Sequence, residues 1–184
     1  MRKLLLSFLL CIFGAMSVSA TDWTDENDVT WSFNITTIDG TTGAKLYGME
    51  GNTNDVVIPE FVYSDEITYP VISIGDYAFE GRISLTSITI PNSVVYIGAS
   101  AFHGCSALTS ITIPNSVINI GESAFYGTAW FNNQPDGLVY AGSVAYRYKG
   151  TMPENTSIVI KDGTRGIADS AFSGCLKMTS IDIP

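Results

Sequence analysis

Basic side chains are scarce in this sequence. The 184 residues contain nine Lys and Arg against eighteen Asp and Glu, which gives a formal net charge of −9. Proteins that bind phosphate backbones or anionic membrane surfaces need clustered Lys and Arg. The composition therefore argues against a nucleic-acid partner. The acidic residues are scattered rather than gathered in runs, which indicates a protein kept soluble by its charge.

Long apolar runs are missing after the first twenty residues, so no later segment has the length of a transmembrane helix. Residues 1–20 have the pattern of a signal peptide, in which two basic residues and a short apolar run precede the small residues Val18–Ala20. An uncleaved anchor needs a longer run, and a lipoprotein needs a small residue before Cys11. We therefore expect secretion or cell-surface export of a mature chain that begins at Thr21. Its seven basic and eighteen acidic side chains give the mature chain a net charge of −11. We expect no membrane insertion after the signal peptide is removed.

What the sequence does contain is a repeat of 23 residues. The hexapeptide Ile74–Phe79 recurs as Ile97–Phe102 and Ile120–Phe125, and a fourth copy, Ile167–Phe172, follows 47 residues later. A fixed period in this range is typical of a solenoid, in which each repeat forms one coil and only stacked coils bury a core. Stacking predicts an internal column of the four aromatic residues that end these hexapeptides: Phe79, Phe102, Phe125 and Phe172.

Each repeat contains a short strand. In the clearest copy, Leu108, Ile111 and Ile113 form the pattern L-x-x-I-x-I, whose last two members point to the same side of an extended chain. Pro114 ends this strand because proline cannot donate to a ladder. The pattern predicts five parallel strands, one for each matched coil, around residues 56–58, 88–90, 111–113, 158–160 and 181–183.

Cysteine is also rare, and only Cys105 and Cys175 follow the first twenty residues. An exported protein invites a disulfide interpretation. However, both residues occupy the same position of the repeat and lie about three coils apart. At roughly 5 Å per coil their Cα atoms would be about 15 Å apart, which is beyond disulfide reach. We expect two unpaired cysteines buried in the core.

The repeats leave little room for an enzyme. The single histidine, His103, stands where other repeats have Glu80, Tyr126 and Ser173, so it is interpreted as a variable, exposed residue. A Ser-His-acid triad would have no other histidine to use. Composition does not exclude a carboxylate pair for glycoside hydrolysis, but the recurring acids occupy variable positions and form no site. No phosphate loop or metal-ligand cluster is recognisable. We expect no enzyme, no catalytic residue, no cofactor and no metal.

Two regions depart from the repeat. Residues 21–52 alternate polar and apolar side chains on both sides of Asp39–Gly40, which predicts a β-hairpin that caps the first coil. Residues 128–156 contain two short strand patterns around Gly142–Ser143. They are expected to replace one coil and to project a hairpin from it.

The unit A-F-x-G-C-x-x-L-x-x-I-x-I-P-x-S-V-x-x-I-G resembles the BspA-type leucine-rich repeat of secreted and surface proteins, over residues 53–184. The resemblance implies a right-handed leucine-rich-repeat superhelix, a β-rich α/β horseshoe with a concave strand-lined face. It also implies export and a role in adhesion or host-protein binding. The sequence stops at Ile183–Pro184, after a strand and without a C-terminal cap. We expect a truncated product or a last coil that a partner covers, including self-association through this uncapped coil.

Two surfaces are candidates for ligand binding. Hydroxyl side chains recur at outward strand positions, and aromatic side chains with a nearby cation gather in the inserted segment. The hydroxyls can simply suit an exposed strand, and an ice-binding array is a further interpretation. The aromatics suit either a binding hot spot or the packing of the inserted hairpin. The candidate residues are Thr86, Thr89, Thr109, Thr112, Thr179 and Asp182 on the strands, and Trp130, Phe131, Tyr140, Tyr146, Arg147 and Tyr148 in the insertion.

The sequence thus predicts a non-catalytic binding module that recognises an extracellular protein or glycan. The alternative is a structural spacer or surface antigen with no dedicated ligand. Exposed aromatics in the inserted segment would favour binding, and buried ones would favour the spacer.

Overall fold

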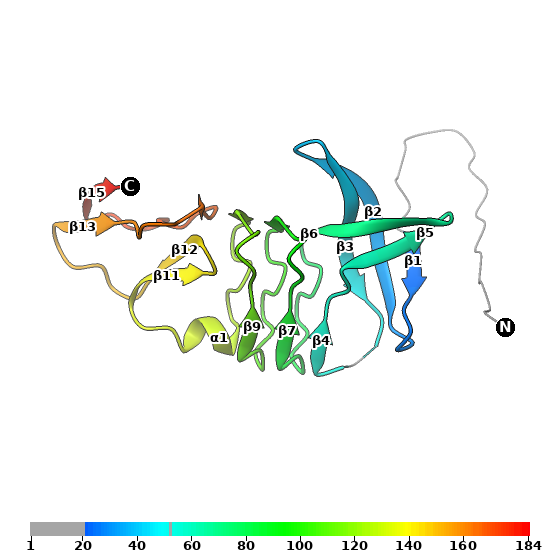
Figure 1. Ribbon diagram of the computed structural model, residues 1–184. Helices are drawn as coiled ribbons and strands as arrows, with labels where there is room; N and C mark the ends of the chain where they lie inside the picture. The colour runs from blue at the N-terminus through cyan, green and yellow to red at the C-terminus, as the bar shows by residue number, and fades with distance from the viewer. Residues whose placement is uncertain (1–20, 52) are drawn as a thin grey trace, which may run out of the picture.

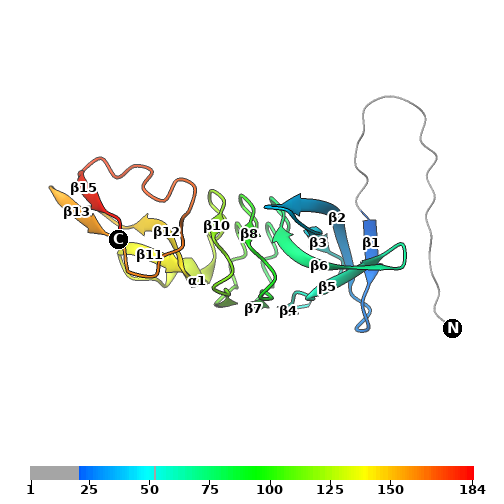
Figure 2. The same ribbon diagram turned by 45° about the horizontal axis from the view of Figure 1, so that its top comes forward.

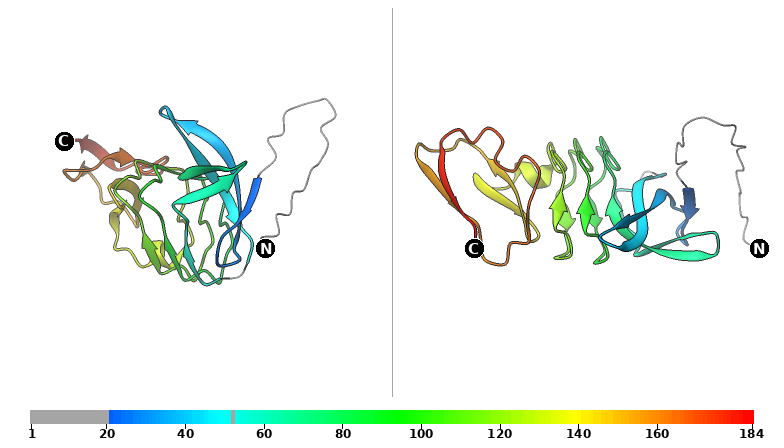
Figure 3. Two further views of the ribbon diagram at one scale, coloured as in Figure 1. Left: turned by 45° about the vertical axis from the view of Figure 1, so that its right-hand side comes forward. Right: turned by 90° about the horizontal axis from the view of Figure 1, so that it is seen from above.

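The computed structural model describes residues 21–51 and 53–184, so the predicted signal peptide lies outside the described residues. The chain winds into a β-solenoid built mostly from short strands (Figure 1). Its coils stack along one axis, and the molecule is elongated when seen from above (Figure 3). None of the helices in the described part of the chain has the length and hydropathy needed to span a bilayer.

One wall of the solenoid is a parallel sheet of three strands, β4 (Asp55–Val57), β7 (Ser87–Thr89) and β9 (Ser110–Thr112). The strands stack in register, so Val56 pairs with Ile88 and Ile88 with Ile111. Side chains alternate across the sheet as the sequence pattern predicts: Ile88 is buried and Thr89 is exposed. The wall therefore has an apolar inner face and an outer face that is polar apart from the exposed Val57.

The opposite wall belongs to a seven-stranded sheet that includes the N-terminal strands. Ile74, Ile97 and Ile120 lie in register across its parallel strands and are fully buried. Figure 2 shows these strands side by side on the face opposite β7. The sheet contains β1 (Thr21–Thr24), β2 (Thr30–Ile38), β3 (Thr41–Met49), β5 (Phe61–Ser64), β6 (Ile67–Ile74), β8 (Tyr96–Ile97) and β10 (Asn119–Ile120).

The predicted N-terminal hairpin is present as β2 and β3, joined at Asp39 and Gly40. Strand β3 pairs in parallel with β6, so the hairpin extends the second wall. Arg82, in the first regular coil, holds the end of β3: its guanidinium donates to the carbonyl oxygen of Gly51 at 2.8 Å and to that of Met49. The strands are confirmed, while the capping role remains a prediction.

The turns between the walls stack as closely as the strands. The backbone N–H of Phe79 donates to Ala101 of the next coil at 2.7 Å, and that of Phe102 donates to Ala124 at 2.8 Å. Glycine allows this approach because a Cβ on Gly121 would lie 2.4 Å from the backbone nitrogen of Ala99. The recurring glycine of the repeat thus allows adjacent coils to lie in close contact.

The aromatic column is confirmed for three of its four predicted members. Phe79, Phe102 and Phe125 stack with ring centroids 5.2 and 5.5 Å apart and nearly parallel planes. The next position is filled by Tyr146, whose ring meets Phe125 edge-on at 5.3 Å. Phe172 was predicted in this column, but it is half-buried and packs in a second, smaller core cluster. The physical reason is that the inserted segment lies between the coil of Phe125 and the coil of Phe172, and its Tyr146 occupies the place next to Phe125.

The inserted segment interrupts the array differently from the prediction. It forms α1 (Ala129–Asn132) and an antiparallel pair, β11 (Gly137–Ala141) and β12 (Val144–Lys149). The predicted strands around Gly142–Ser143 are confirmed, but the hairpin does not project. Strand β12 pairs in parallel with β14 (Gly166–Ile167), and Val144 and Ala145 are fully buried. The hairpin therefore forms a separate three-stranded sheet with β14, and its apolar side chains cover the core.

The five predicted parallel strands form two sheets rather than one. After β9, the pattern resumes only in β13 (Thr156–Val159) and β15 (Met178–Asp182), which pair with each other. Figure 1 shows β13 and β15 apart from β4, β7 and β9, with α1 and the β11–β12 hairpin between them. Among the described residues, no strand pairs with β9 on the side away from β7. Residues 129–132 form α1 at that place.

Both cysteines are unpaired, as predicted. Cys105 is fully buried, and its thiol donates to the carbonyl oxygen of Phe79 at 2.9 Å. Cys175 was also predicted to be buried, but it is only half-buried because the second core cluster is smaller.

Candidate functional site: the outer face of the parallel strands

The inserted segment places two of its candidate binding residues in the core. Phe131 is 6% exposed and Tyr146 is 1% exposed. Their rings meet edge-on at 5.6 Å, and Trp130 packs edge-on against Phe125 at 5.2 Å. A ligand on the surface does not reach Phe131 or Tyr146. These aromatics pack the core at the interruption of the array.

Tyr146 also completes the hydrogen bonding of the adjacent coil. Its hydroxyl accepts from the backbone N–H of Phe125 at 2.9 Å, inside the core. Burial raises the pKa of Tyr146 to about 12. The buried side chain of Thr128 provides a second such contact, because its hydroxyl donates to the Phe125 carbonyl at 2.8 Å and caps α1 by accepting from the N–H of Phe131.

The other candidates of the insertion are half-buried. Tyr148 and Tyr140 pack against the second core cluster, and Arg147 is half-exposed on the same strand as Tyr148. The Tyr140 hydroxyl accepts from the backbone N–H of Lys161 at 3.0 Å, and the Lys161 ammonium lies 4.2 Å from the ring centroid. The exposed face of the Tyr140 ring is thus already in contact with a cation of the same chain.

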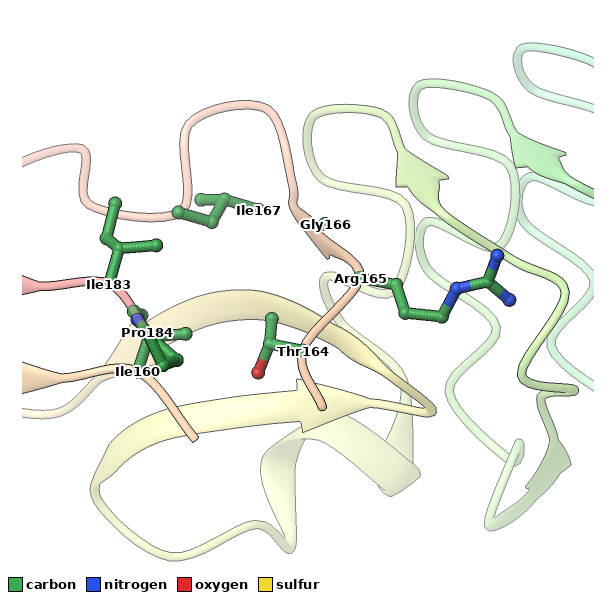
Figure 4. A pocket seen from close by; sticks show the side chains of 7 residues that line it. All are labelled: Ile160, Thr164, Arg165, Gly166, Ile167, Ile183 and Pro184. Atoms are coloured by element: carbon green, nitrogen blue, oxygen red, sulfur yellow. The ribbon is translucent and has the colours of Figure 1, made fainter. Parts of the chain in front are cut away.

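Two shallow depressions adjoin this region. One, of about 240 Å³, is lined by Tyr140 and Lys161 together with Asn115, Gly142, Ser143, Asp162, Gly163 and Thr164. The other, of about 160 Å³, lies between the ends of β13 and β15 and the segment 164–167 (Figure 4). In Figure 4 three isoleucines gather around it, while the Arg165 side chain points away toward the neighbouring coil, where it donates to the Asn115 carbonyl at 2.7 Å. Neither depression collects a set of convergent catalytic groups.

The hydroxyl side chains of the strands lie on the surface. On β7 and β9, Thr89, Ser110 and Thr112 are exposed, and Thr89 pairs in register with Thr112. Within the described residues these three side chains make no hydrogen bond to the protein. We call the outward positions of the three strands the hydroxyl face: Asp55, Val57, Ser87, Thr89, Ser110 and Thr112.

Two other hydroxyls predicted on this surface are held along the ladder. Thr109 donates to the carbonyl oxygen of Thr86 at 3.4 Å, and the Thr86 hydroxyl donates to the carboxylate of Asp55 at 2.9 Å. These bonds tie adjacent coils to each other. Thr86 and Thr109 therefore support the hydroxyl face from its edge.

Asp55 is a member of the face that the sequence interpretation missed. Its carboxylate accepts from Ser87 at 2.6 Å as well as from Thr86. These two hydrogen bonds, the one from Ser87 first, lower the pKa of Asp55 below its usual range. The signal was available, because Asp55 stands in the first strand at the position of Ser87 and Ser110 in the next two.

The remaining predicted residues lie on the second pair of strands. Thr179 donates to the carbonyl oxygen of Thr156 at 3.1 Å, and Ser157 and Ser180 share a hydrogen bond of 2.7 Å. Asp182 is exposed and pairs with Val159. Because β9 and β13 are not paired, these residues do not continue the hydroxyl face.

In the described part of the chain, no group of three or more His, Cys, Asp or Glu is placed to hold a metal ion. His103 lies 3.3 Å from Glu80 and stacks on Tyr126 at 5.7 Å, on the surface of the turns. All three belong to the same position of successive repeats.

Comparisons with known proteins agree with the geometry. A family model described as a BspA type leucine-rich repeat region matches in six copies, with residues 142–184 matched. A leucine-rich repeat protein from Bacteroides ovatus is 29% identical over 84% of this chain, with a TM-score of 0.53. A leucine-rich cell surface protein from Faecalibacterium prausnitzii is 25% identical over 91% of this chain, with a TM-score of 0.55.

The chain spans only part of these relatives, 40% of the Bacteroides protein and 44% of the Faecalibacterium protein. A leucine-rich repeat protein of T. pallidum, 25% identical over 81% of this chain with a TM-score of 0.52, is covered over 67% of its length. No curated protein matches this chain.

Proposed function

Because this chain belongs to the BspA-type leucine-rich-repeat family, we propose that it is a secreted or cell-surface binding protein without catalytic activity, whose ligand contacts the hydroxyl face. The similar protein from F. prausnitzii is described as a cell surface protein, which supports this location. The ligand is an extracellular protein or glycan, and the proposed role is adhesion or recognition.

The observation that carries the proposal is the set of exposed hydroxyls on a rigid sheet. Thr89, Ser110 and Thr112 have no hydrogen-bond partner among the described residues, and each hydroxyl can both donate and accept. Threonine and serine in a paired strand lose little further freedom when a ligand binds, so the entropic cost of recognition is small. Such a face suits polar partners, including the hydroxyl-rich surface of a glycan.

The proposal is tested by binding of the purified protein to an array of extracellular-matrix proteins and glycans. The informative variant is Thr89→Lys with Thr112→Lys, which places two long charged side chains on the face. Its matched control is Thr37→Lys with Thr42→Lys, because Thr37 and Thr42 are also an exposed, in-register pair, on β2 and β3. Saturable binding that only the first variant loses supports the proposal. Binding that both variants retain, or no binding by a folded protein, contradicts it.

A second candidate function is a structural spacer or surface antigen with no dedicated ligand. The burial of Phe131 and Tyr146 favours it, because it removes two large aromatic side chains from the surfaces open to a partner. The array separates the two candidates, since a spacer gives no saturable ligand.

A further inference from the structure

A hairpin next to the first coil leaves two aromatic side chains on the surface. Strands β5 and β6 pair in register, with Phe61 opposite Pro70, Val62 opposite Tyr69 and Tyr63 opposite Thr68. Figures 1 and 2 show this hairpin extending past β4 toward β1. Because side chains alternate along a strand, Phe61 and Tyr63 lie on the face opposite Val62.

The two faces of the hairpin have different surroundings. On the inner face Val62 is 1% exposed and Tyr69 packs against the main core, so the hairpin is fixed to the solenoid. On the outer face Phe61 is 48% exposed and Tyr63 is 49% exposed. An exposed apolar group of this kind on a fixed strand pair is typical of a contact surface.

The hairpin is also acidic. Glu60, Asp65 and Glu66 are exposed, and residues 60–70 contain no Lys, Arg or His. A second copy of this chain would bring the same three carboxylates against these, which is unfavourable in a protein that already carries excess negative charge. A basic partner has the complementary charge.

We propose that the outer face of the β5–β6 hairpin binds a protein segment in which apolar side chains alternate with Lys or Arg. The apolar side chains of the segment cover Phe61 and Tyr63, and its cations lie near Glu60, Asp65 and Glu66. An extended segment with a period of two presents all its apolar groups to one side, as the flat face of a strand pair requires. None of these residues belongs to the hydroxyl face, so the inference stands independently of the proposed function.

The test uses a synthetic peptide of alternating leucine and lysine, and a counterpart with glutamate in place of lysine. We expect the protein to bind the lysine peptide and to lose roughly tenfold or more in affinity when Phe61→Ser and Tyr63→Ser are combined. The control combines Tyr77→Ser and Tyr126→Ser, which removes two other exposed rings at positions where other repeats have serine. This control is expected to bind as the unmodified protein does.

A charge series completes the test, because an acidic protein can attract a cationic peptide anywhere on its surface. Glu60→Gln, Asp65→Asn and Glu66→Gln together are expected to weaken binding more than Glu122→Gln, Asp162→Asn and Asp169→Asn. Hydrogen exchange with the peptide bound is expected to slow across residues 61–69. The inference is overturned if the lysine peptide does not bind, if Phe61→Ser with Tyr63→Ser binds unchanged, if the two charge series weaken binding equally, or if the glutamate peptide binds as tightly. Circular dichroism of each variant establishes that it is folded.

Discussion

The hydroxyl of Tyr146 accepts a hydrogen bond from the backbone N–H of Phe125 at 2.9 Å. In the two preceding coils, the corresponding N–H groups of Phe79 and Phe102 donate to backbone carbonyls of the next coil. The Tyr146 hydroxyl thus provides the acceptor that a backbone carbonyl of the next coil provides in the regular repeats. Immediately beyond it, the backbone resumes this role, since the N–H of Tyr148 donates to the carbonyl oxygen of Ala171 at 2.8 Å.

Removing this hydroxyl is expected to destabilise the protein. Tyr146→Phe keeps the ring and its edge-on contacts but leaves the buried N–H of Phe125 without an acceptor, which costs about 1–3 kcal/mol. Urea denaturation measures the loss as a lower midpoint at an unchanged slope. Tyr148→Phe is the control, because Tyr148 is half-buried and its hydroxyl makes no hydrogen bond within the described residues. Equal midpoints for the two variants would refute the role of Tyr146 in the ladder.

Alkaline pH is expected to destabilise the protein in two overlapping steps. Burial raises the pKa of the Cys105 thiol from 9.0 to about 11 and that of the Tyr146 phenol from 10.0 to about 12. Between each pair of values the unfolded chain loses a proton that the folded protein keeps. The free energy of unfolding therefore falls as pH rises, from about pH 9 for Cys105 and about pH 10 for Tyr146.

The two steps can be separated by substitution. Cys105→Ala is expected to remove the part of the pH dependence that begins near pH 9, and Tyr146→Phe the part that continues toward pH 12. Urea midpoints measured between pH 8 and pH 12 provide the comparison. A pH profile that keeps its shape in both variants would assign the alkaline loss to other groups.

Gly121 is expected to tolerate no side chain. A Cβ at this position would lie 2.4 Å from the backbone nitrogen of Ala99, so the adjacent coils would have to separate. Gly121→Ala should therefore lower stability by about 1–3 kcal/mol or more, although alanine ordinarily stabilises relative to glycine. Glu122 is the next residue and is exposed, so Glu122→Ala serves as the control. An increase in thermal midpoint for Gly121→Ala would show that the coils are not in close contact there.

Removing two buried hydroxyl groups is expected to have different effects on the free energy of unfolding. The Thr128 side chain donates to one backbone group and accepts from another, so Thr128→Ala should cost about 1–2 kcal/mol. The buried Ser116 Oγ has no hydrogen-bond partner among the residues that the structure describes. Ser116→Ala should therefore be neutral or stabilising by up to about 1 kcal/mol. Differential scanning calorimetry of both variants tests the contrast, and a comparable loss in Ser116→Ala would indicate a partner for that hydroxyl.

The sequence pattern was sufficient to predict the structure of the regular coils, because the same alternation of apolar and polar residues repeats in each strand. Alternation along β7 and β9 places Ile88 inside and Thr89 outside, as predicted. The spacing of Cys105 and Cys175 was likewise enough to predict that they are unpaired. Local pattern and stacking agree in these coils, so the prediction needs no information from distant residues.

The pattern failed where tertiary contacts decide the structure. The strands of the insertion were predicted, but their packing against the solenoid depends on Val144, Ala145 and Tyr146 filling the core. Tyr146 and Phe125 are 21 residues apart, and no periodicity links a side-chain hydroxyl to the N–H that it satisfies. For the same reason the break between β9 and β13, which separates Asp182 from the hydroxyl face, could not be predicted from composition.

The most direct test of the central claim is hydrogen exchange of the protein with and without a ligand selected on the extracellular array. If the hydroxyl face is the contact surface, the ligand should slow exchange at residues 87–90 and 110–113, while residues 137–149 remain unchanged. Slowing confined to residues 137–149, with β7 and β9 unaffected, would contradict the account and return the binding site to the inserted segment.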